Sequence, residues 1–182
     1  MAIPSHWFAQ VASLEEHTDC DPVGLCFCIF LPRGIGGGGG STPPENTTSL
    51  ITYTTTTKYG NNTVTFFIIY LFNGSVSVDP GYFDYTPFNV TAGGMNVTVT
   101  GNFSASGGTG NDIEVYIMNS TQYNSWYNGN QTSVYYDSGQ VTASNISLSL
   151  PPGQSYYLIF DNSFSSISSK TVSGEIKLTY FI

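Results

Sequence analysis

Residues 151–180 read PPGQSYYLIFDNSFSSISSKTVSGEIKLTY, and this stretch decides the fold. A proline–glycine turn leads into an apolar segment that ends in Asp161 and Asn162. A serine-rich loop and Lys170 follow, and in residues 172–180 apolar side chains then alternate with polar ones. Because such alternation places the apolar side chains on one face of a strand, we expect two strands of a β-sandwich joined by a loop. We expect this sandwich to bind other molecules without performing chemistry on them.

The end of the first of these two segments predicts a structural clamp. Asp161 and Asn162 are expected to bond back to the amides of the loop, as Asx turns do. Lys170 is expected to pair with Asp161 and so tie the loop to the strand. On this interpretation Asp161, Asn162 and Lys170 identify a fold, not a binding site.

Strand signals recur upstream, with turn signals between them. Many short strands at near-regular spacing predict an all-β fold, an antiparallel β-sandwich or jelly roll of about eight strands. No segment after residue 45 shows helical periodicity, so we expect no helix there. The expected strands cover residues 50–57, 64–72, 82–90, 95–103, 113–118, 133–137, 146–150, 156–161 and 172–180.

The chain divides at a run of five glycines followed by Ser-Thr-Pro-Pro. This composition predicts a linker over residues 36–44. It separates an N-terminal segment, residues 1–35, from a single sandwich over residues 45–182. Residues 5–17 are compatible with a short amphipathic helix. The glycine run resembles an engineered spacer as much as a natural stalk, and the sequence leaves open whether residues 1–40 are native.

Residues 25–31 (LCFCIFL) form a continuous apolar run. They are too few to cross a bilayer as a helix, which takes about 20 residues, and we expect no transmembrane segment in this chain. A strand with Leu25, Phe27, Ile29 and Leu31 on one face is the better interpretation. On its glycine tether this strand could pair with the open edge of a neighbouring subunit and build a polymer by donor-strand exchange. The alternatives are pairing within its own sandwich, or an unrelated fused sequence.

All three cysteines of the chain precede the linker. Cys20, Cys26 and Cys28, together with His17, could ligate a metal, although their spacing matches no standard zinc finger. The alternative is one disulfide, either Cys20–Cys26 or Cys20–Cys28, with one thiol left over.

Residue types that catalysis commonly needs are missing from the predicted sandwich. After residue 45 the sequence contains no His, Cys or Arg. This excludes a Ser-His-Asp triad, a Cys-His pair and a His- or Cys-ligated zinc within that unit. The net charge of −8 argues against nucleic acid as a partner. We therefore expect a non-enzymatic domain without a metal or other cofactor.

Two weaker chemical hypotheses involve carboxylates. Asp112 and Glu114 lie two apart on an expected strand and would share a face, as the two acids of a glycosidase must. A polar outer strand face explains them equally well. A calcium site could use Asn111 and Asp112 with a further acid, either Asp137 or Asp161, because calcium takes clustered oxygen ligands.

The segment YNSWYNG, residues 123–129, is rich in aromatic residues within an expected polar loop. Exposed rings of Tyr123, Trp126 and Tyr127 could stack on sugars or peptides. The competing interpretation folds the loop back so that Trp126 plugs one end of the sandwich.

Composition points outside the cytoplasm. Only 9% of residues are charged, whereas soluble domains carry about a quarter. Low charge, many tyrosines and dense sequons resemble cell-surface proteins of thermoacidophilic archaea. The nine Asn-X-Ser/Thr sequons favour a secreted, glycosylated protein. They lie at Asn46, Asn61, Asn73, Asn89, Asn96, Asn102, Asn119, Asn130 and Asn145.

The C-terminal half resembles the GOLD (Golgi-dynamics) domain over roughly residues 85–182. Upstream, DIEV at residues 112–115 and YDSG at residues 136–139 also resemble prokaryotic GOLD-like extracytoplasmic domains. The resemblance implies a sandwich that binds protein partners, as in cargo receptors and lipid-transfer proteins. We expect no C-terminal coiled coil, membrane span or lipid-binding domain in this sequence, so the resemblance does not imply Golgi trafficking. The residues that match the family's closing pattern are Pro152, Gly153, Tyr157, Leu158, Phe160, Asp161, Asn162, Ser163, Ser165, Lys170 and Val172.

Taken together, the sequence predicts a non-catalytic extracytoplasmic interaction or structural domain of a cell-surface protein. Its partner would be another protein or a second copy, recognised by a sheet edge or end loops. The alternative is a carbohydrate-binding module that uses the rings around Trp126. A flat row of exposed rings would favour sugar, and a buried Trp126 would exclude it.

Overall fold

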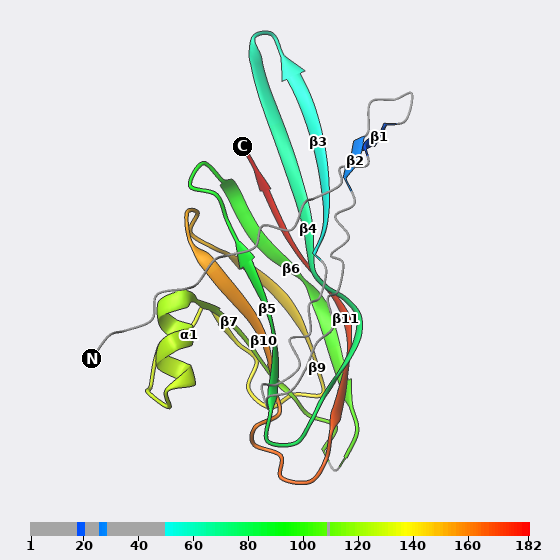
Figure 1. The fold of residues 1–182 in the computed structure, drawn as a ribbon, viewed down its shortest axis with the longest axis vertical. Helices are drawn as coiled ribbons and strands as arrows, with labels where there is room; N and C mark the ends of the chain where they lie inside the picture. Colours follow the sequence, from blue (N-terminus) through cyan, green and yellow to red (C-terminus); the bar gives the residue numbers. More distant parts are fainter. Residues whose placement is uncertain (1–17, 21–25, 29–49, 109) are drawn as a thin grey trace, which may run out of the picture.

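The computed structural model describes residues 18–20, 26–28, 50–108 and 110–182. These residues form two antiparallel sheets stacked as a β-sandwich, which confirms the predicted fold class (Figure 1). Sheet A has seven strands in the order β1-β2-β3-β4-β11-β6-β9, and sheet B has four in the order β5-β10-β7-β8. Strands β3 to β11 number nine, close to the eight or so predicted.

Strands β3 to β11 follow the expected segments of sequence, whereas β1 lies outside them. Strand β4 runs past residue 72, where the expected strand ended, because Gly74 pairs with Gly174 of β11 and the ladder continues to Val78. Sheet A contains β1 (Thr18–Cys20), β2 (Cys26–Cys28), β3 (Ile51–Tyr59), β4 (Asn62–Val78), β6 (Met95–Ser106), β9 (Ala143–Ser149) and β11 (Lys170–Phe181). Sheet B contains β5 (Phe83–Asn89), β7 (Glu114–Asn119), β8 (Tyr136–Asp137) and β10 (Ser155–Asp161).

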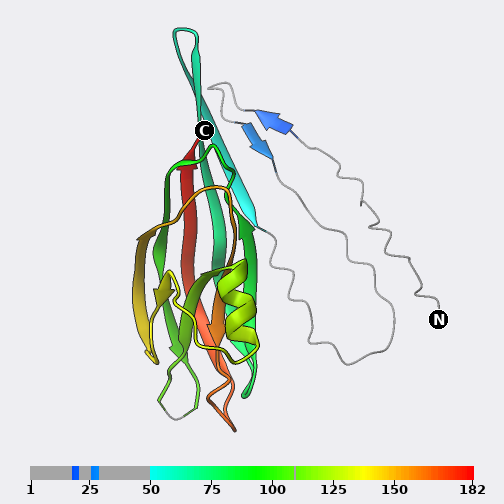
Figure 2. The ribbon, with the colours of Figure 1, turned by 90° about the vertical axis from the view of Figure 1, so that its left-hand side faces the viewer.

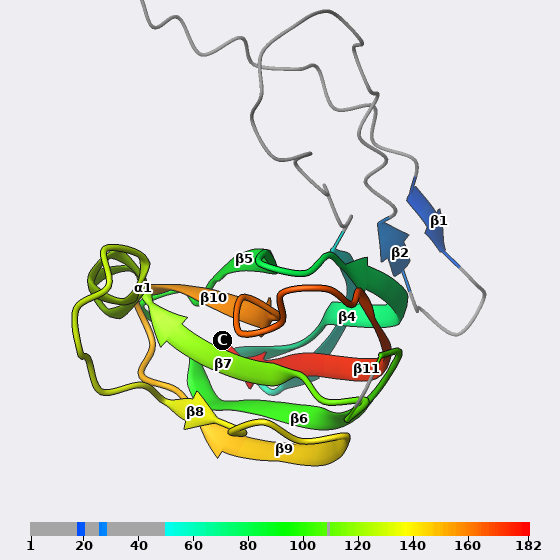
Figure 3. The ribbon, with the colours of Figure 1, turned by 90° about the horizontal axis from the view of Figure 1, so that it is seen from below.

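The two C-terminal strands occupy interior positions of different sheets. Strand β10 pairs with β5 on one side and β7 on the other. Strand β11 pairs with β4 and β6 in the same way. The loop between them, residues 162–169, crosses from sheet B to sheet A at one end of the sandwich (Figure 3). Residues 151–180 thus contain an interior strand of each layer and the loop that joins them.

The core lies between the sheets and follows the period-two pattern. On β10 the inward side chains are Tyr156, Leu158 and Phe160, each at most 2% exposed. On β11 the predicted inward side chains Ile176, Leu178 and Tyr180 are buried, as are Val172 and Lys170. Phe160 meets Phe72 of sheet A edge to face, with ring centroids 4.8 Å apart. This contact joins the two layers.

Two glycines let β6 and β11 approach closely. A Cβ on Gly101 would lie 2.1 Å from the carbonyl oxygen of Glu175, and one on Gly174 would lie 2.2 Å from that of Asn102. Both glycines have positive φ, 156° and 157° respectively, a region that side chains rarely adopt. The interruption that Gly101 makes in the apolar pattern is therefore a requirement of the packing.

Residues 120–127 form a helix where the sequence predicted a loop. Helix α1 (Ser120–Tyr127) begins at Asn119, whose side chain accepts a hydrogen bond from the backbone of Gln122. The side chain of Gln122 in turn accepts from the backbone of Asn119 at 2.9 Å. This reciprocal capping box is the signal that the expectation of no helix overlooked.

Several N-terminal predictions lie outside the described residues. These are the helix over residues 5–17, the linker over residues 36–44, the metal candidate His17, the sequon at Asn46 and, from the donor strand, Leu25, Ile29 and Leu31. The rest of that strand is described as β2, which pairs with β3 of the same chain at Phe27 opposite Tyr53 (Figure 2). This pairing is the arrangement expected if the strand stays with its own sandwich.

Candidate interaction site

Aromatic side chains gather on the outer face of sheet B. On β10, Ile159 points away from the core because Leu158 and Phe160 point into it. Tyr85 of β5 and Tyr116 of β7 lie directly opposite Ile159 and so share its face. With rings from α1 they form what we term the aromatic face, made of Phe83, Tyr85, Tyr116, Tyr123, Trp126, Tyr127 and Tyr157.

Helix α1 is attached to this face by ring contacts. Tyr123 stacks on Tyr157 with ring centroids 4.2 Å apart and 13° between the planes. Trp126 meets Phe83 edge to face at 5.0 Å, and its ring lies 5.9 Å from that of Tyr116. Offset and edge-to-face pairs of this kind add to the stabilisation that burial gives.

The contacts of α1 enclose a small second core. Ile159 and Met118 are both 0% exposed although they point out of the sandwich. Met118 lies opposite Tyr157 in the β7–β10 ladder, and Tyr157 is covered by Tyr123. The outer face of sheet B is therefore partly apolar and partly covered by α1.

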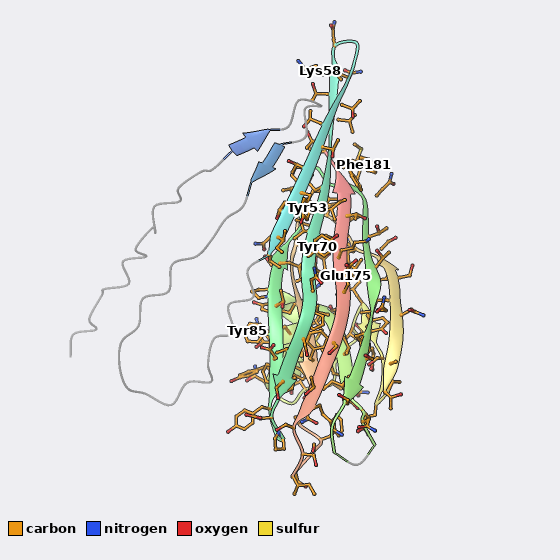
Figure 4. The ribbon with its side chains drawn as sticks, turned by 90° about the vertical axis from the view of Figure 1, so that its right-hand side faces the viewer. Tyr53, Lys58, Tyr70, Tyr85, Glu175 and Phe181 are labelled. Carbon is orange, nitrogen blue, oxygen red and sulfur yellow. The ribbon has the colours of Figure 1, made fainter. Side chains whose placement is uncertain are left out.

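The aromatic face is neither a buried plug nor a flat row of rings. Tyr127 is 63% exposed and Tyr85 is 38% exposed, whereas Trp126 is half-buried. Trp126 thus lies on the outer face of sheet B, whereas the plug interpretation placed it at one end of the sandwich. Figure 4 labels Tyr85 among the side chains drawn as sticks.

Hydroxyl and carboxylate groups border the rings. The hydroxyl of Tyr116 donates to Glu114 Oε2 at 2.7 Å, and burial followed by this bond raises the pKa of Tyr116. Burial also raises the pKa of Tyr123 to about 12. These phenols stay neutral donors at ordinary pH. Asp137 is exposed and lies opposite Tyr116 in the β7–β8 ladder. The carboxylates of Glu114 and Asp137 therefore make this edge of the aromatic face acidic.

The predicted loop clamp is present in part. Asp161 Oδ1 accepts from the backbone N–H of Ser163 at 2.8 Å, as an Asx turn requires. Asn162 Nδ2 donates to the carbonyls of Val78 at 3.0 Å and Ser168 at 2.9 Å, which ties the loop to β4. Its Oδ1 is buried without a hydrogen-bond partner among the described residues.

The ion pair of Lys170 differs from the prediction. Lys170 Nζ lies 2.8 Å from Oδ1 of Asp112, and this bond lowers the pKa of Asp112. Lys170 is on the core side of β11, whereas Asp161 is on the outer side of β10, opposite Glu114. The two predicted partners thus face different ways. Asp161 is only 4% exposed, and this burial raises its pKa.

The carboxylates do not assemble a catalytic or calcium site in the described part of the chain. Asp112 is paired with Lys170, and Glu114 accepts from Tyr116. Asp137 accepts from the backbone of Gly139 at 2.8 Å. Within residues 18–20, 26–28, 50–108 and 110–182, no three His, Cys, Asp or Glu side chains are grouped so that they could hold a metal. A hollow of about 370 Å³ between β6 and β9 has no titratable lining residue.

Eight of the nine sequons fall in described residues. Seven of their asparagines are exposed, and the exception is the half-buried Asn119. Its side chain caps α1, and its Nδ2 donates to Gln154 Oε1 at 3.2 Å. Three others form a row on sheet A, because Asn73 and Asn102 both lie opposite Glu175 and Asn102 lies opposite Asn145.

Comparison with known proteins identifies the C-terminal half. The family described as emp24/gp25L/p24 family/GOLD matches residues 88–180, from the end of β5 to the end of β11. The match includes α1 and most of the strands beneath the aromatic face. No curated protein matches the chain. Among the described residues, no helix combines the length and hydropathy needed to cross a membrane.

Proposed function

Because this chain belongs to the emp24/gp25L/p24 (GOLD) family, we propose that it binds a protein partner through the aromatic face. Domains of this family mediate protein interactions, are non-enzymatic, and act on the lumenal or extracytoplasmic side of the secretory pathway. We place this chain on the extracytoplasmic side, as a domain of a cell-surface protein. The sandwich would begin near residue 45, since Leu50 already packs against the core.

One observation carries the choice of surface. Tyr127 and Tyr85 are exposed, and both are supported from behind by other rings. Tyrosine and tryptophan in such rigid surroundings are enriched among the residues that dominate binding energy in protein interfaces.

The charges around the face indicate the chemistry of the partner. Glu114 and Asp137 lie beside Tyr116, and the whole chain has a net charge of −8. Arginine or lysine in the partner would meet both carboxylates and ring faces here. We therefore propose a partner segment in which basic residues alternate with apolar ones.

Photo-crosslinking tests this proposal at single residues. Tyr127 is replaced by p-benzoylphenylalanine, and in a matched protein Tyr82 is replaced instead. Tyr82 is equally exposed, 60% against 63%, and stands at the corner between β4 and β5. We expect crosslinks to a defined protein from position 127 and not from position 82.

The crosslinked protein is then purified and its affinity measured directly. The double substitution Tyr85→Ser and Tyr127→Ser should weaken binding by about tenfold or more, whereas Tyr82→Ser should leave it unchanged. Binding should also weaken as salt concentration rises. Equal affinity of the double variant and the unmodified chain would contradict the assignment of the surface.

The other two hypotheses from the sequence receive less support. Sugar binding favours a flat row of rings, yet Trp126 meets Phe83 edge to face. Donor-strand exchange needs a free segment at residues 25–31, yet Phe27 lies opposite Tyr53 of its own chain. Titration with oligosaccharides, and the oligomeric state after deletion of residues 1–44, would test them.

A further inference from the structure

The three cysteines, whose pairing the sequence left open, hold defined positions in the β1–β2 ladder. Cys20 lies directly opposite Cys26, and Thr18 lies opposite Cys28. The two short strands run side by side next to β3 (blue in Figure 2). The whole chain contains three cysteines, so these positions decide every possible disulfide within it.

Backbone geometry separates the possible pairs. Residues directly opposite in an antiparallel ladder have Cα atoms about 4.5 to 5.5 Å apart, within the range of about 4.4 to 6.8 Å that disulfides span. Cys20 and Cys28 are diagonal neighbours, which lie about 7 to 8 Å apart. Cys26 and Cys28 are alternate residues of one strand, a spacing at which the Cβ atoms of a strand leave the backbone in the same direction and do not approach one another.

We propose that Cys20 and Cys26 form a disulfide that closes the β1–β2 hairpin and leaves Cys28 as a thiol. The bond needs an oxidising compartment, so in the cell it rests on the extracytoplasmic location proposed above. Its structural effect is local: β2 is the strand that pairs with β3, and the disulfide holds β1 and β2 together at the edge of sheet A. Where β2 pairs with β3, that side of β3 cannot pair with another chain.

The reaction balances as thiol–disulfide exchange with a small disulfide such as oxidised glutathione. The thiolate of one cysteine attacks a glutathione sulfur and releases one glutathione thiolate. The second cysteine thiolate then attacks the protein sulfur of the mixed disulfide and releases the other glutathione. Two protein thiols lose two electrons and two protons, and one glutathione disulfide becomes two thiols.

Peptide mapping of the full chain tests the pairing. The protein is equilibrated with a mixture of oxidised and reduced glutathione, trapped by alkylation at acid pH and cut with chymotrypsin. Cleavage after Leu25 and Phe27 separates all three cysteines. We expect a peptide ending at residue 25 joined to residues 26–27, and Cys28 alkylated. A link to Cys28, or alkylation of all three, would overturn the proposal.

Two matched variants provide a quantitative comparison. Cys28→Ser keeps the proposed pair, whereas Cys26→Ser leaves only Cys20 with Cys28. The equilibrium constant for disulfide formation with glutathione should be at least about tenfold larger in Cys28→Ser, equivalent to about 30 mV. Equal constants would contradict the argument from register. Neither measurement involves a binding partner, so the outcome is independent of the aromatic face.

Discussion

The ion pair between Lys170 and Asp112 offers a sharp test of the packing. Lys170 is 2% exposed and Asp112 is 24% exposed, with Nζ and Oδ1 2.8 Å apart. Asp112→Ala removes the carboxylate and leaves a buried ammonium group without it. Lys170→Met removes the charge that cannot reach water and keeps much of the side-chain volume. The two substitutions break the same bond, yet they should have unequal effects.

The expected sizes follow from which charge is left behind. Removing one member of a buried pair costs about 3–5 kcal/mol, and we expect about 3 kcal/mol for Asp112→Ala because the partly exposed site admits some water. After Lys170→Met the remaining carboxylate is already hydrated in part, so about 1 kcal/mol is expected. The double variant should resemble Lys170→Met, since it contains no buried ammonium group.

Equilibrium unfolding in urea at pH 7, followed by circular dichroism, measures these free energies. Each variant is compared with the unmodified chain. The comparison holds when both have the same m-value, the slope of unfolding free energy against urea concentration. If Asp112→Ala cost no more than Lys170→Met, the ammonium group would not be held in a water-poor site. The assignment of Lys170 to the core side of β11 would then be wrong.

Three further changes test other parts of the structure. Burial raises the pKa of Asp161 above its usual 3.8, so the folded chain loses stability as pH rises through that raised pKa. Asp161→Asn should therefore be the more stable at pH 7 in urea unfolding, with the difference vanishing below about pH 3; a constant difference would contradict this. Gly101→Ala should lower the free energy of unfolding by about 3 kcal/mol or more, because the added Cβ would lie 2.1 Å from the carbonyl oxygen of Glu175. The control Gly139→Ala, with positive φ but open surroundings, should cost about 1 kcal/mol, and similar losses would refute the close-approach argument. Asn119→Ala should destabilise α1 by about 1 kcal/mol, seen as a shift in tryptophan fluorescence. Glycopeptide mapping from a glycosylating host should find Asn119 unmodified, and a glycan there would contradict its role as a cap.

The strands could be predicted from sequence because their signals are local. Period-two alternation in residues 172–180 gave the buried face of β11 correctly, and Ile176, Leu178 and Tyr180 are all in the core. Helix α1 was missed because serine, threonine, asparagine and tyrosine are mediocre helix formers. An eight-residue helix depends on tertiary contacts, here the stacking of Tyr123 on Tyr157.

The candidate site could be predicted only in part. The rings of residues 123–127 were singled out, but Phe83, Tyr85, Tyr116 and Tyr157 were not, because they meet α1 only through the pairing of β5, β10 and β7. The error over Lys170 was avoidable. Phe160 points into the core, and alternation along the strand therefore puts its neighbour Asp161 on the outer side. The true partner, 58 positions away in sequence, emerges only from the fold.

The interior position of β11 has a mechanical consequence. Along its twelve residues the strand is paired with β4 on one side and β6 on the other. Ladder hydrogen bonds run across the strands, so tension applied along the axis of β11 would strain both ladders at once instead of peeling one bond at a time. A domain at the surface of a cell that was pulled through this strand would resist extension by shear, with the load shared between the two neighbours.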